Sequence, residues 1–131
     1  MTLADAAETL VGTPFRLHGR SPVHGVDCVG LVACALTLCG REPRPPSGYQ
    51  LRNCDIAAHL DFAHRNGFEP VAGRTVRGDL LLVTPGPAQH HLLVSLGTSD
   101  FIHAHAGLRR VVRTIGTPQW PILNHWRLAP N

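Results

Sequence analysis

Charged residues are scarce in this sequence: Asp, Glu, Lys and Arg make up 16% of its 131 residues, against about a quarter in an ordinary globular protein. Hydrophobic residues still make up 44%, so the composition is not that of a disordered chain. The twelve Lys and Arg exceed the nine Asp and Glu by only three, and no block of like charges is present. The composition predicts a folded domain and gives no support to a nucleic-acid partner.

Long apolar runs are absent as well. The most apolar uncharged stretch, residues 28–40, falls short of the roughly 20 residues that cross a bilayer, and residues 80–99 are interrupted by prolines and polar side chains. The N-terminus, MTLADAAETL, has acidic residues and no basic region before an apolar run, unlike a signal peptide. We therefore expect no membrane span, a chain that is cytoplasmic as synthesised, and reduced cysteines.

Paired cysteines at zinc-binding spacing are also lacking. The four cysteines (Cys28, Cys34, Cys39 and Cys54) form no Cys-x-x-Cys pair, which argues against a structural zinc site. Histidine, by contrast, is abundant, with nine copies in the chain. Thiols and imidazoles together supply the groups for nucleophilic chemistry, and this excess is the feature that a function has to explain.

The expected elements fall into two halves, with helices first and strands afterwards. This order favours a single α+β domain over residues 1–131 with an antiparallel sheet of about five strands, rather than an alternating parallel fold. The Pro-rich segment 41–50 is expected to be a surface loop. The helices are expected over 2–11 with Thr2 as N-cap, 27–40 with Asp27 as N-cap, and 53–66 with Asn53 or Asp55 as N-cap; the strands are expected over 78–83, 91–96, 101–105, 110–115 and 122–128.

Cys28 is the strongest candidate nucleophile. It follows Asp27 at the start of a helix that is apolar nearly all round and therefore buried. Helix N-terminal N–H groups stabilise a thiolate, so we expect the pKa of Cys28 to fall below about 8.5. The same groups can bind the oxyanion that forms when a thiolate attacks a carbonyl. The alternative for Cys28 is a small core residue, the interpretation we favour for Cys34 and Cys39.

A thiolate enzyme also needs a base and a group that orients it. If strands 91–96 and 101–105 form a hairpin over Gly97-Thr98-Ser99, Leu96 pairs with Asp100 and Leu93 with His103. His91 and His103 then lie on one face as diagonal neighbours, about 7–8 Å apart. A loop one residue longer or shorter would send them to opposite faces.

The remaining histidines leave alternatives open. His90 and His105 could replace a member of this pair if the register differs, and His90, His91, His103 and His105 together could bind a metal. No carboxylate is adjacent to them in sequence, which makes a metal the weaker hypothesis. The other five (His18, His24, His59, His64 and His125) are expected to face solvent.

These residues resemble the signature of the NlpC/P60 cysteine peptidases. In that family a Gly-Thr-Pro-Tyr segment precedes an Asp-Cys-Ser-Gly-Leu helix start, followed by a Gly-Asp-Leu strand, a His-Val-Gly-Ile-Tyr-Leu-Gly strand and a strand with a third polar residue. The matching segments here are Val11-Gly-Thr-Pro-Phe15, Gly19, Gly25-Val-Asp-Cys-Val-Gly-Leu-Val32, Gly78-Asp-Leu-Leu81, His91-Leu-Leu-Val-Ser-Leu-Gly97 and Phe101-Ile-His-Ala104. The resemblance extends over about residues 5–115.

The resemblance implies a papain-like α+β fold in which the nucleophile helix packs on the sheet. It implies Cys28 as nucleophile, His91 as general base and then acid, and His103 as the residue that orients His91. The implied reaction is hydrolysis of amide bonds in peptidoglycan stem peptides through a thioester, without a cofactor. A peptidoglycan peptide is then the substrate partner.

Two departures from the family pattern affect specificity. Phe15 replaces the usual Tyr and Val29 the usual Ser; with Asp27 these positions hold the substrate's amino end in the γ-D-glutamyl-diamino acid peptidases. We retain Asp27, Phe15, Val29 and Arg16 as candidate substrate-binding residues. The Asp-Cys-Val-Gly-Leu start is similar to members encoded with phage tails or gene transfer agents, which implies phage-tail-like partners and action on the wall as part of a particle.

Three rival functions remain. The first is a thiol acyltransferase or amidase with a lipid or small-molecule amide as substrate, which an apolar groove without Arg16 or Arg20 at its edge would favour. The second is an inactive structural domain of a tail-like assembly. The third is the metal-binding protein.

Overall fold

The computed structural model describes residues 1–44, 46 and 56–131. Helix α1 (Leu3–Thr9) begins at Thr2, which forms a capping box with Asp5. Helix α2 (Cys28–Leu38) begins at Asp27, whose carboxylate accepts the Gly30 N–H. Both N-caps are the predicted residues, because a short polar side chain satisfies N–H groups that have no helical partner. The predicted caps of helix α3 (Ile56–Arg65), Asn53 and Asp55, lie outside the described residues.

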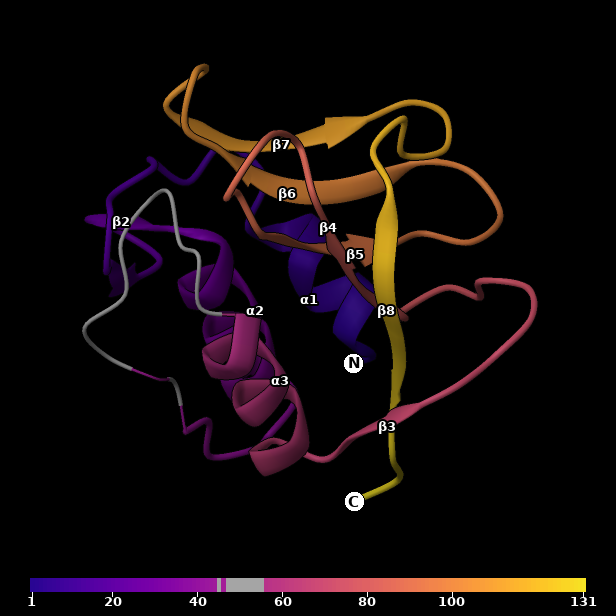
Figure 1. Cartoon of the computed structure of the whole chain (residues 1–131). Coiled ribbons are helices and arrows are strands. Elements are labelled where there is room, and N and C mark those ends of the chain that lie inside the picture. Colours follow the sequence, from indigo (N-terminus) through magenta and orange to yellow (C-terminus); the bar gives the residue numbers. More distant parts are fainter. Residues whose placement is uncertain (45, 47–55) are drawn as a thin grey trace.

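The strands form a six-stranded sheet and a small ribbon. The ribbon pairs β1 (Arg20–Ser21) with β2 (Gly25–Val26). The large sheet has the order β3-β8-β4-β5-β6-β7, and neighbouring strands among the described residues are antiparallel. Figure 1 shows its twist: β8 runs down the view, whereas β6 and β7 cross its upper part. The strands of the large sheet are β3 (Phe68–Pro70), β4 (Leu80–Val83), β5 (His91–Ser95), β6 (Phe101–His105), β7 (Arg110–Thr114) and β8 (Ile122–Leu128).

The predicted α+β architecture is confirmed, with one strand more than the expected five. Strand β3 pairs with β8 through Phe68–Leu128 and Glu69–Arg127. It is only three residues long and ends in Pro70, so it lacks the alternation that identifies a strand in sequence. Helix α1 also ends earlier than predicted, at Thr9 rather than at residue 11. Within the described part of the chain, no helix has both the length and the hydrophobicity that a membrane crossing requires.

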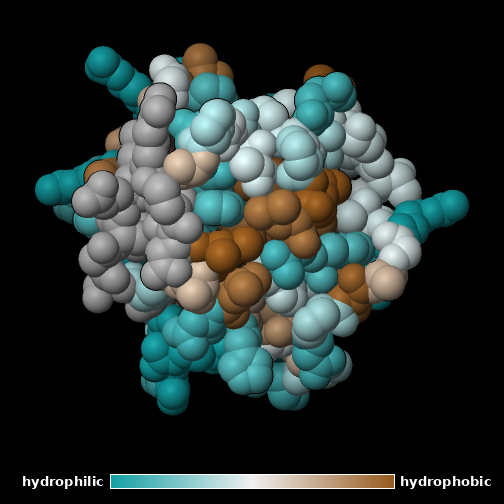
Figure 2. Space-filling model, in the orientation of Figure 1, coloured by the Kyte–Doolittle hydropathy of each residue, from teal (hydrophilic) through white to brown (hydrophobic). Residues whose placement is uncertain are grey.

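Two hydrophobic clusters lie on opposite faces of the sheet. Alternate strand residues, such as Leu92 and Ile102, pack with the helices in the main core, whereas Leu93 and Phe101 belong to a second cluster with Trp120. Helix α2 packs on β5 and β6 and is buried from Cys28 to Leu36, as its uniform hydrophobicity predicts. In the orientation of Figure 1, hydrophobic residues gather near the middle of the visible face, with hydrophilic ones around them (Figure 2).

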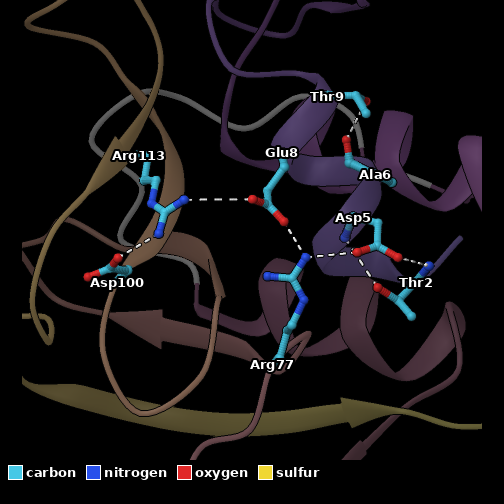
Figure 3. Close-up of polar contacts among 8 residues, drawn as sticks. All are labelled: Thr2, Asp5, Ala6, Glu8, Thr9, Arg77, Asp100 and Arg113. Atoms are coloured by element: carbon cyan, nitrogen blue, oxygen red, sulfur yellow. Dashed lines mark hydrogen bonds and ion pairs between the residues drawn. The ribbon is translucent and has the colours of Figure 1, made fainter.

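Two polar networks link elements that lie far apart along the chain. The fully buried Asp79 carboxylate accepts hydrogen bonds from Arg127 at 2.8 and 3.0 Å and lies 2.6 Å from His125 Nε2. This contact contradicts the solvent-facing position predicted for His125. At the surface, Glu8 of α1 contacts both Arg77 and Arg113 (Figure 3). The first network fixes the start of β4 against β8, and the second links α1 to β7 and to the loop before β4.

Candidate active site

A cavity of about 270 Å³ opens where the N-terminal end of α2 meets the start of β5 and the end of β6. Cys28, His91 and His103, the three predicted catalytic residues, all line it. The antiparallel pairing of β5 with β6 produces this meeting, since it brings the first residue of one strand beside the last residue of the other. The other described lining residues are Phe15, Leu17, Asp27, His59, Pro85, Gln89, His90, Ala104, His105, Ala106, Gly107 and Trp120.

Close backbone contact fixes the start of α2. A Cβ atom on Gly30 would lie 2.0 Å from the carbonyl oxygen of Gly19, so no larger residue fits there without moving the loop. Within the preceding segment, Phe15 N–H donates to Arg109 O and Gly12 N–H to Val111 O. The loop before α2 is therefore held against β7 on one side and against the first turn of the helix on the other. This packing places Cys28 at the cavity.

Asp27 is an N-cap whose buried carboxylate also forms an ion pair with the partly exposed Arg20. Its carboxylate accepts the Gly30 N–H at 2.9 Å, the His18 N–H at 2.7 Å and an Arg20 N–H at 3.2 Å. The Asp27 side chain is only 3% exposed. A carboxylate has about four lone-pair positions, and three of them are occupied by these contacts. Its charge is compensated by Arg20, which also donates to the carbonyl oxygen of Pro46.

The pKa of Cys28 is raised to about 12, opposite to the lowering that the helix N-terminus predicts. Burial is the largest cause, and the Asp27 carboxylate adds to it. Hydrogen bonds from the backbone of Leu92 and Val29 act in the other direction but are outweighed. The contact with Leu92, the residue after His91, also shows how closely the thiol approaches the start of β5. Burial and the Asp27 charge therefore both favour the neutral form of the Cys28 thiol.

The two predicted histidines are in direct contact. His91 Nε2 lies 2.9 Å from His103 Nδ1, and His103 Nε2 lies 3.1 Å from Thr114 Oγ1. The pairs Val94–Ile102 and Ser95–Phe101 give the predicted hairpin register, and the Leu96 N–H donates to Asp100 O. His91 and His103 thus share a face, in phase with Leu93 and Phe101.

Burial keeps both imidazoles neutral. It lowers the pKa of His91 to about 3 and that of His103 to about 4, with repulsion from neighbouring histidines as a further cause. Trp120 contributes to this burial, because its ring centroid lies 6.2 Å from that of His91 and 5.8 Å from that of His103. The ring centroid of Phe101 lies 5.0 Å from that of His103. Trp120 lies between Pro118 and Pro121 in the segment before β8, and no sequence signal marked it as part of the site.

Three more histidines line the cavity. The side chain of His59 in α3 is buried, with 2% exposure, and its ring lies 6.2 Å from that of His90, so the predicted solvent-facing position of His59 is wrong. An amphipathic pattern alone did not show that the polar edge of α3 covers a cavity. His105 accepts the Leu108 N–H on Nδ1, and its ring lies 5.4 Å from that of His103.

The candidate substrate-binding residues divide into two pairs. Phe15 and Asp27 line the cavity. Val29 is fully buried in the main hydrophobic core and is not among the described residues that line the cavity. Arg16 is exposed and also lies outside the lining.

Neither Cys34 nor Cys39 is among the described residues that line the cavity. Cys34 is buried and donates to Arg20 O at 3.4 Å, Cys39 is half-buried, and Cys54 lies outside the described residues. Nowhere in residues 1–44, 46 and 56–131 are three His, Cys, Asp or Glu side chains grouped so as to hold a metal ion.

Solved structures with the same fold come from several organisms. The chain superposes on the NlpC/P60 domain of the peptidoglycan hydrolase SagA with a TM-score of 0.65 at 23% identity, covering 97% of each chain. For the peptidoglycan hydrolase RipB from Mycobacterium tuberculosis the TM-score is 0.67 at 21% identity, covering 98% of this chain and 64% of that one. For a lipoprotein-like NLP/P60 protein from Staphylococcus aureus the TM-score is 0.67 at 19% identity. The superposition covers 99% of this chain and 41% of the staphylococcal one.

This chain therefore spans less than half of the staphylococcal protein and nearly all of the SagA domain. Comparison with the curated proteins gives no significant match. At these identities the superpositions establish the fold, which agrees with the architecture predicted from the sequence. The sequence profile of the NlpC/P60 family matches residues 12–123, a range that includes Cys28, His91 and His103. The chain belongs to the NlpC/P60 family.

Proposed function

We propose that this protein is a thiol hydrolase that cleaves amide bonds in peptidoglycan stem peptides. The observation that carries the proposal is the placement of Cys28 in one cavity with the hydrogen-bonded pair His91 and His103. Family membership supports the reaction class. Two proteins of the same fold, SagA and RipB, are peptidoglycan hydrolases, which supports the substrate.

The proposed reaction proceeds through a thioester. Cys28 Sγ attacks the amide carbon while its proton passes to His91, and the oxyanion is stabilised at the N-terminal end of α2. His91 then gives this proton to the leaving amine as the C–N bond breaks. A water molecule loses a proton to His91 and attacks the thioester, which releases the acid and returns the proton to the sulfur. His103 orients His91 through the 2.9 Å contact.

The pKa directions favour proton transfer during the attack over a preformed ion pair. Because burial raises the pKa of Cys28 and lowers that of His91, the resting state contains a neutral thiol and a neutral imidazole. Substrate binding that brings the carbonyl into the cavity then makes transfer to His91 favourable, since the negative charge moves from sulfur to the carbonyl oxygen.

The placement of Asp27 bears on specificity. Its carboxylate is already bound by Arg20 and by two backbone N–H groups, and the neighbouring positions are the apolar Phe15 and Val29. An ammonium group would gain little there, because the charge it would meet is compensated. This supports a substrate whose amino end is acylated over one with a free amine.

The apolar lining favours a second candidate, a thiol acyltransferase or amidase that acts on an apolar acyl amide. Phe15, Leu17, Pro85 and Trp120 line the cavity, and among the described residues neither Arg16 nor Arg20 does. An acyl chain would bury its surface against this wall, a gain of about 25 cal/mol per Å².

One experiment separates the two candidates. Purified protein is incubated with peptidoglycan of several stem types and, separately, with N-acyl amides in the presence of a primary amine, and the products are identified by mass spectrometry. We expect new muropeptides with a free amine and a free carboxyl at one cleaved bond. Acyl transfer to the amine without any change in the muropeptides would establish the second candidate instead.

A role in a phage-tail-like particle belongs to the same proposal and is supported by the likeness of the Asp27-Cys-Val-Gly-Leu31 start to tail-associated members of the family. If it is correct, the protein should be detected by mass spectrometry in purified particles that carry tails. Its consistent absence from such particles would remove this part of the proposal.

A further inference from the structure

Thr114 extends the histidine pair by one residue. Its Oγ1 lies 3.1 Å from His103 Nε2, and the other ring nitrogen of His103 lies 2.9 Å from His91 Nε2. His103 is only 3% exposed, so both of its nitrogens have their partners within the protein. Strand pairing fixes this position: His103 is opposite Val112 and Phe101 is opposite Thr114. Thr114 is therefore the diagonal neighbour of His103 on the same face of the sheet.

A neutral imidazole carries one N–H and one lone pair, so the chain of contacts has only two consistent arrangements. In the first, His91 Nε2–H donates to His103 Nδ1 and His103 Nε2–H donates to Thr114 Oγ1. In the second, every proton points the other way, which puts the proton of His91 on Nδ1. Only the first arrangement leaves a lone pair on His91 Nδ1, the nitrogen that makes no contact with His103.

We infer that Thr114 is a positioning residue whose hydroxyl accepts the His103 Nε2–H and thereby sets the tautomers of both histidines. Thr114 is half-buried, so its own O–H can donate to water at the surface. Every donor in the series His91, His103 and Thr114 then has an acceptor. His91 Nδ1, at the buried end of this series, keeps the lone pair that must accept the Cys28 proton. The catalytic consequence rests on the proposed function; the tautomers do not.

The first test is by NMR and needs no substrate. In protein labelled with ¹⁵N-histidine at neutral pH, long-range ¹H–¹⁵N correlations show which ring nitrogen carries the proton. We expect Nε2–H for both His103 and His91 in the wild type and in Thr114→Ser. In Thr114→Val, which has no acceptor, we expect a loss of Nε2–H population at His103 and the appearance of Nδ1–H at His91.

The second test measures turnover of peptidoglycan peptides. Thr114→Val removes the acceptor of the buried His103 N–H, so kcat should fall by roughly 5–150-fold with KM nearly unchanged. Thr114→Ser should recover most of the rate, because it restores the hydroxyl. Thr117→Val, an exposed change beyond the end of β7, is the matched control and should have no effect.

Each outcome decides the inference. Unchanged tautomers in Thr114→Val overturn it, and so does an equal loss of kcat in the Ser and Val variants, since a role in packing alone would give that result. Thermal unfolding of both variants identifies any loss of fold. If the wild type cleaves no peptide while the tautomers behave as expected, the proposed function fails and the positioning role of Thr114 stands.

Discussion

His91 Nε2 and His103 Nδ1 lie 2.9 Å apart across two neighbouring strands. The contact depends on the Gly97-Thr98-Ser99 connection, because one residue more or fewer would put the two side chains on opposite faces of the sheet. It also fixes the plane of the His91 ring. The residue after His91 is Leu92, and the backbone of Leu92 forms a hydrogen bond with the sulfur of Cys28. The turn thus determines whether the cavity contains an imidazole that a second histidine holds in one orientation.

Replacing the nucleophile should abolish activity and leave the fold intact. Cys28→Ala removes only the sulfur from the first turn of α2, so we expect no cleaved muropeptides above background by mass spectrometry. Circular dichroism should match the wild type, since Ala has a high helix propensity. The matched control is Cys34→Ala, which changes a buried thiol outside the cavity lining and should retain activity. Full activity in Cys28→Ala would refute the catalytic assignment.

Stability should decrease as the pH falls from about 6.5 toward 3. The folded-state pKa values of His91 and His103, about 3 and about 4, lie below the unfolded value of about 6.5. The unfolded chain therefore binds more protons within this window, and stability present above pH 6.5 is lost on acidification. At pH 5 the two histidines together should lower the free energy of unfolding by on the order of 2–4 kcal/mol relative to pH 7.5. Urea unfolding at the two pH values measures this difference.

The control for this pH dependence is the double variant His91→Gln, His103→Gln. Its unfolding free energy should change less between the two pH values, because Gln does not titrate. An equal change in the wild type and the variant would show that other groups are responsible.

Asp27 and Arg20 should shift the reactivity of Cys28 in opposite directions. The Asp27 charge raises the pKa of Cys28 and the Arg20 charge lowers it. In Asp27→Asn, which keeps an oxygen for the Gly30 N–H, alkylation of Cys28 by iodoacetamide should begin at lower pH than in the wild type. In Arg20→Gln it should begin at higher pH. Peptide mass spectrometry follows Cys28 separately from the other cysteines, and shifts in the same direction would contradict the electrostatic explanation.

Asp79→Asn should destabilise the fold. The change removes the charge that Arg127 and His125 contact and leaves the Arg127 guanidinium without its carboxylate. Breaking a fully buried pair costs about 3–5 kcal/mol; we expect about 2 kcal/mol, because the Arg127 side chain is 43% exposed. Chemical unfolding measures the loss. The exposed Asp61→Asn, which removes an i,i+4 pair with Arg65, is the control and should change stability far less.

Gly30→Ala should reduce stability although alanine is the better helix former. A Gly to Ala change inside a helix normally stabilises by about 1 kcal/mol. Here the new Cβ would lie 2.0 Å from Gly19 O, and overpacking of this kind costs about 1–3 kcal/mol. Thermal unfolding should show a lower Tm than the wild type. The control is Thr37→Ala, at an exposed position in the same helix, which should not lower the Tm. A higher Tm for Gly30→Ala would show that the loop containing Gly19 can move to accommodate the new Cβ.

Local patterns were sufficient to predict most of the fold. Thr2 and Asp27 cap their helices because they are short polar side chains before apolar runs, and the Gly97-Thr98-Ser99 loop fixes a hairpin register through backbone geometry alone. The same register places His91 beside His103, so the contact between these two histidines could be predicted from the loop length. Strand β3 could not, since its three residues form a strand only because β8 lies beside them.

What the sequence determined by itself was the order of the elements, the caps of α1 and α2, and the contact of His91 with His103, because each depends on residues close along the chain or within one hairpin. Tertiary structure alone decided the burial of His59 and the packing of Trp120 against His91 and His103. It also decided the contact of Thr114 with His103 and the pairing of Asp79 with His125 and Arg127. These depend on which distant segments exclude water from one another. For the same reason the pKa of Cys28 rises where the helix terminus alone predicts that it falls: the N-terminal N–H groups are a local feature, whereas the burial that outweighs them comes from the whole fold.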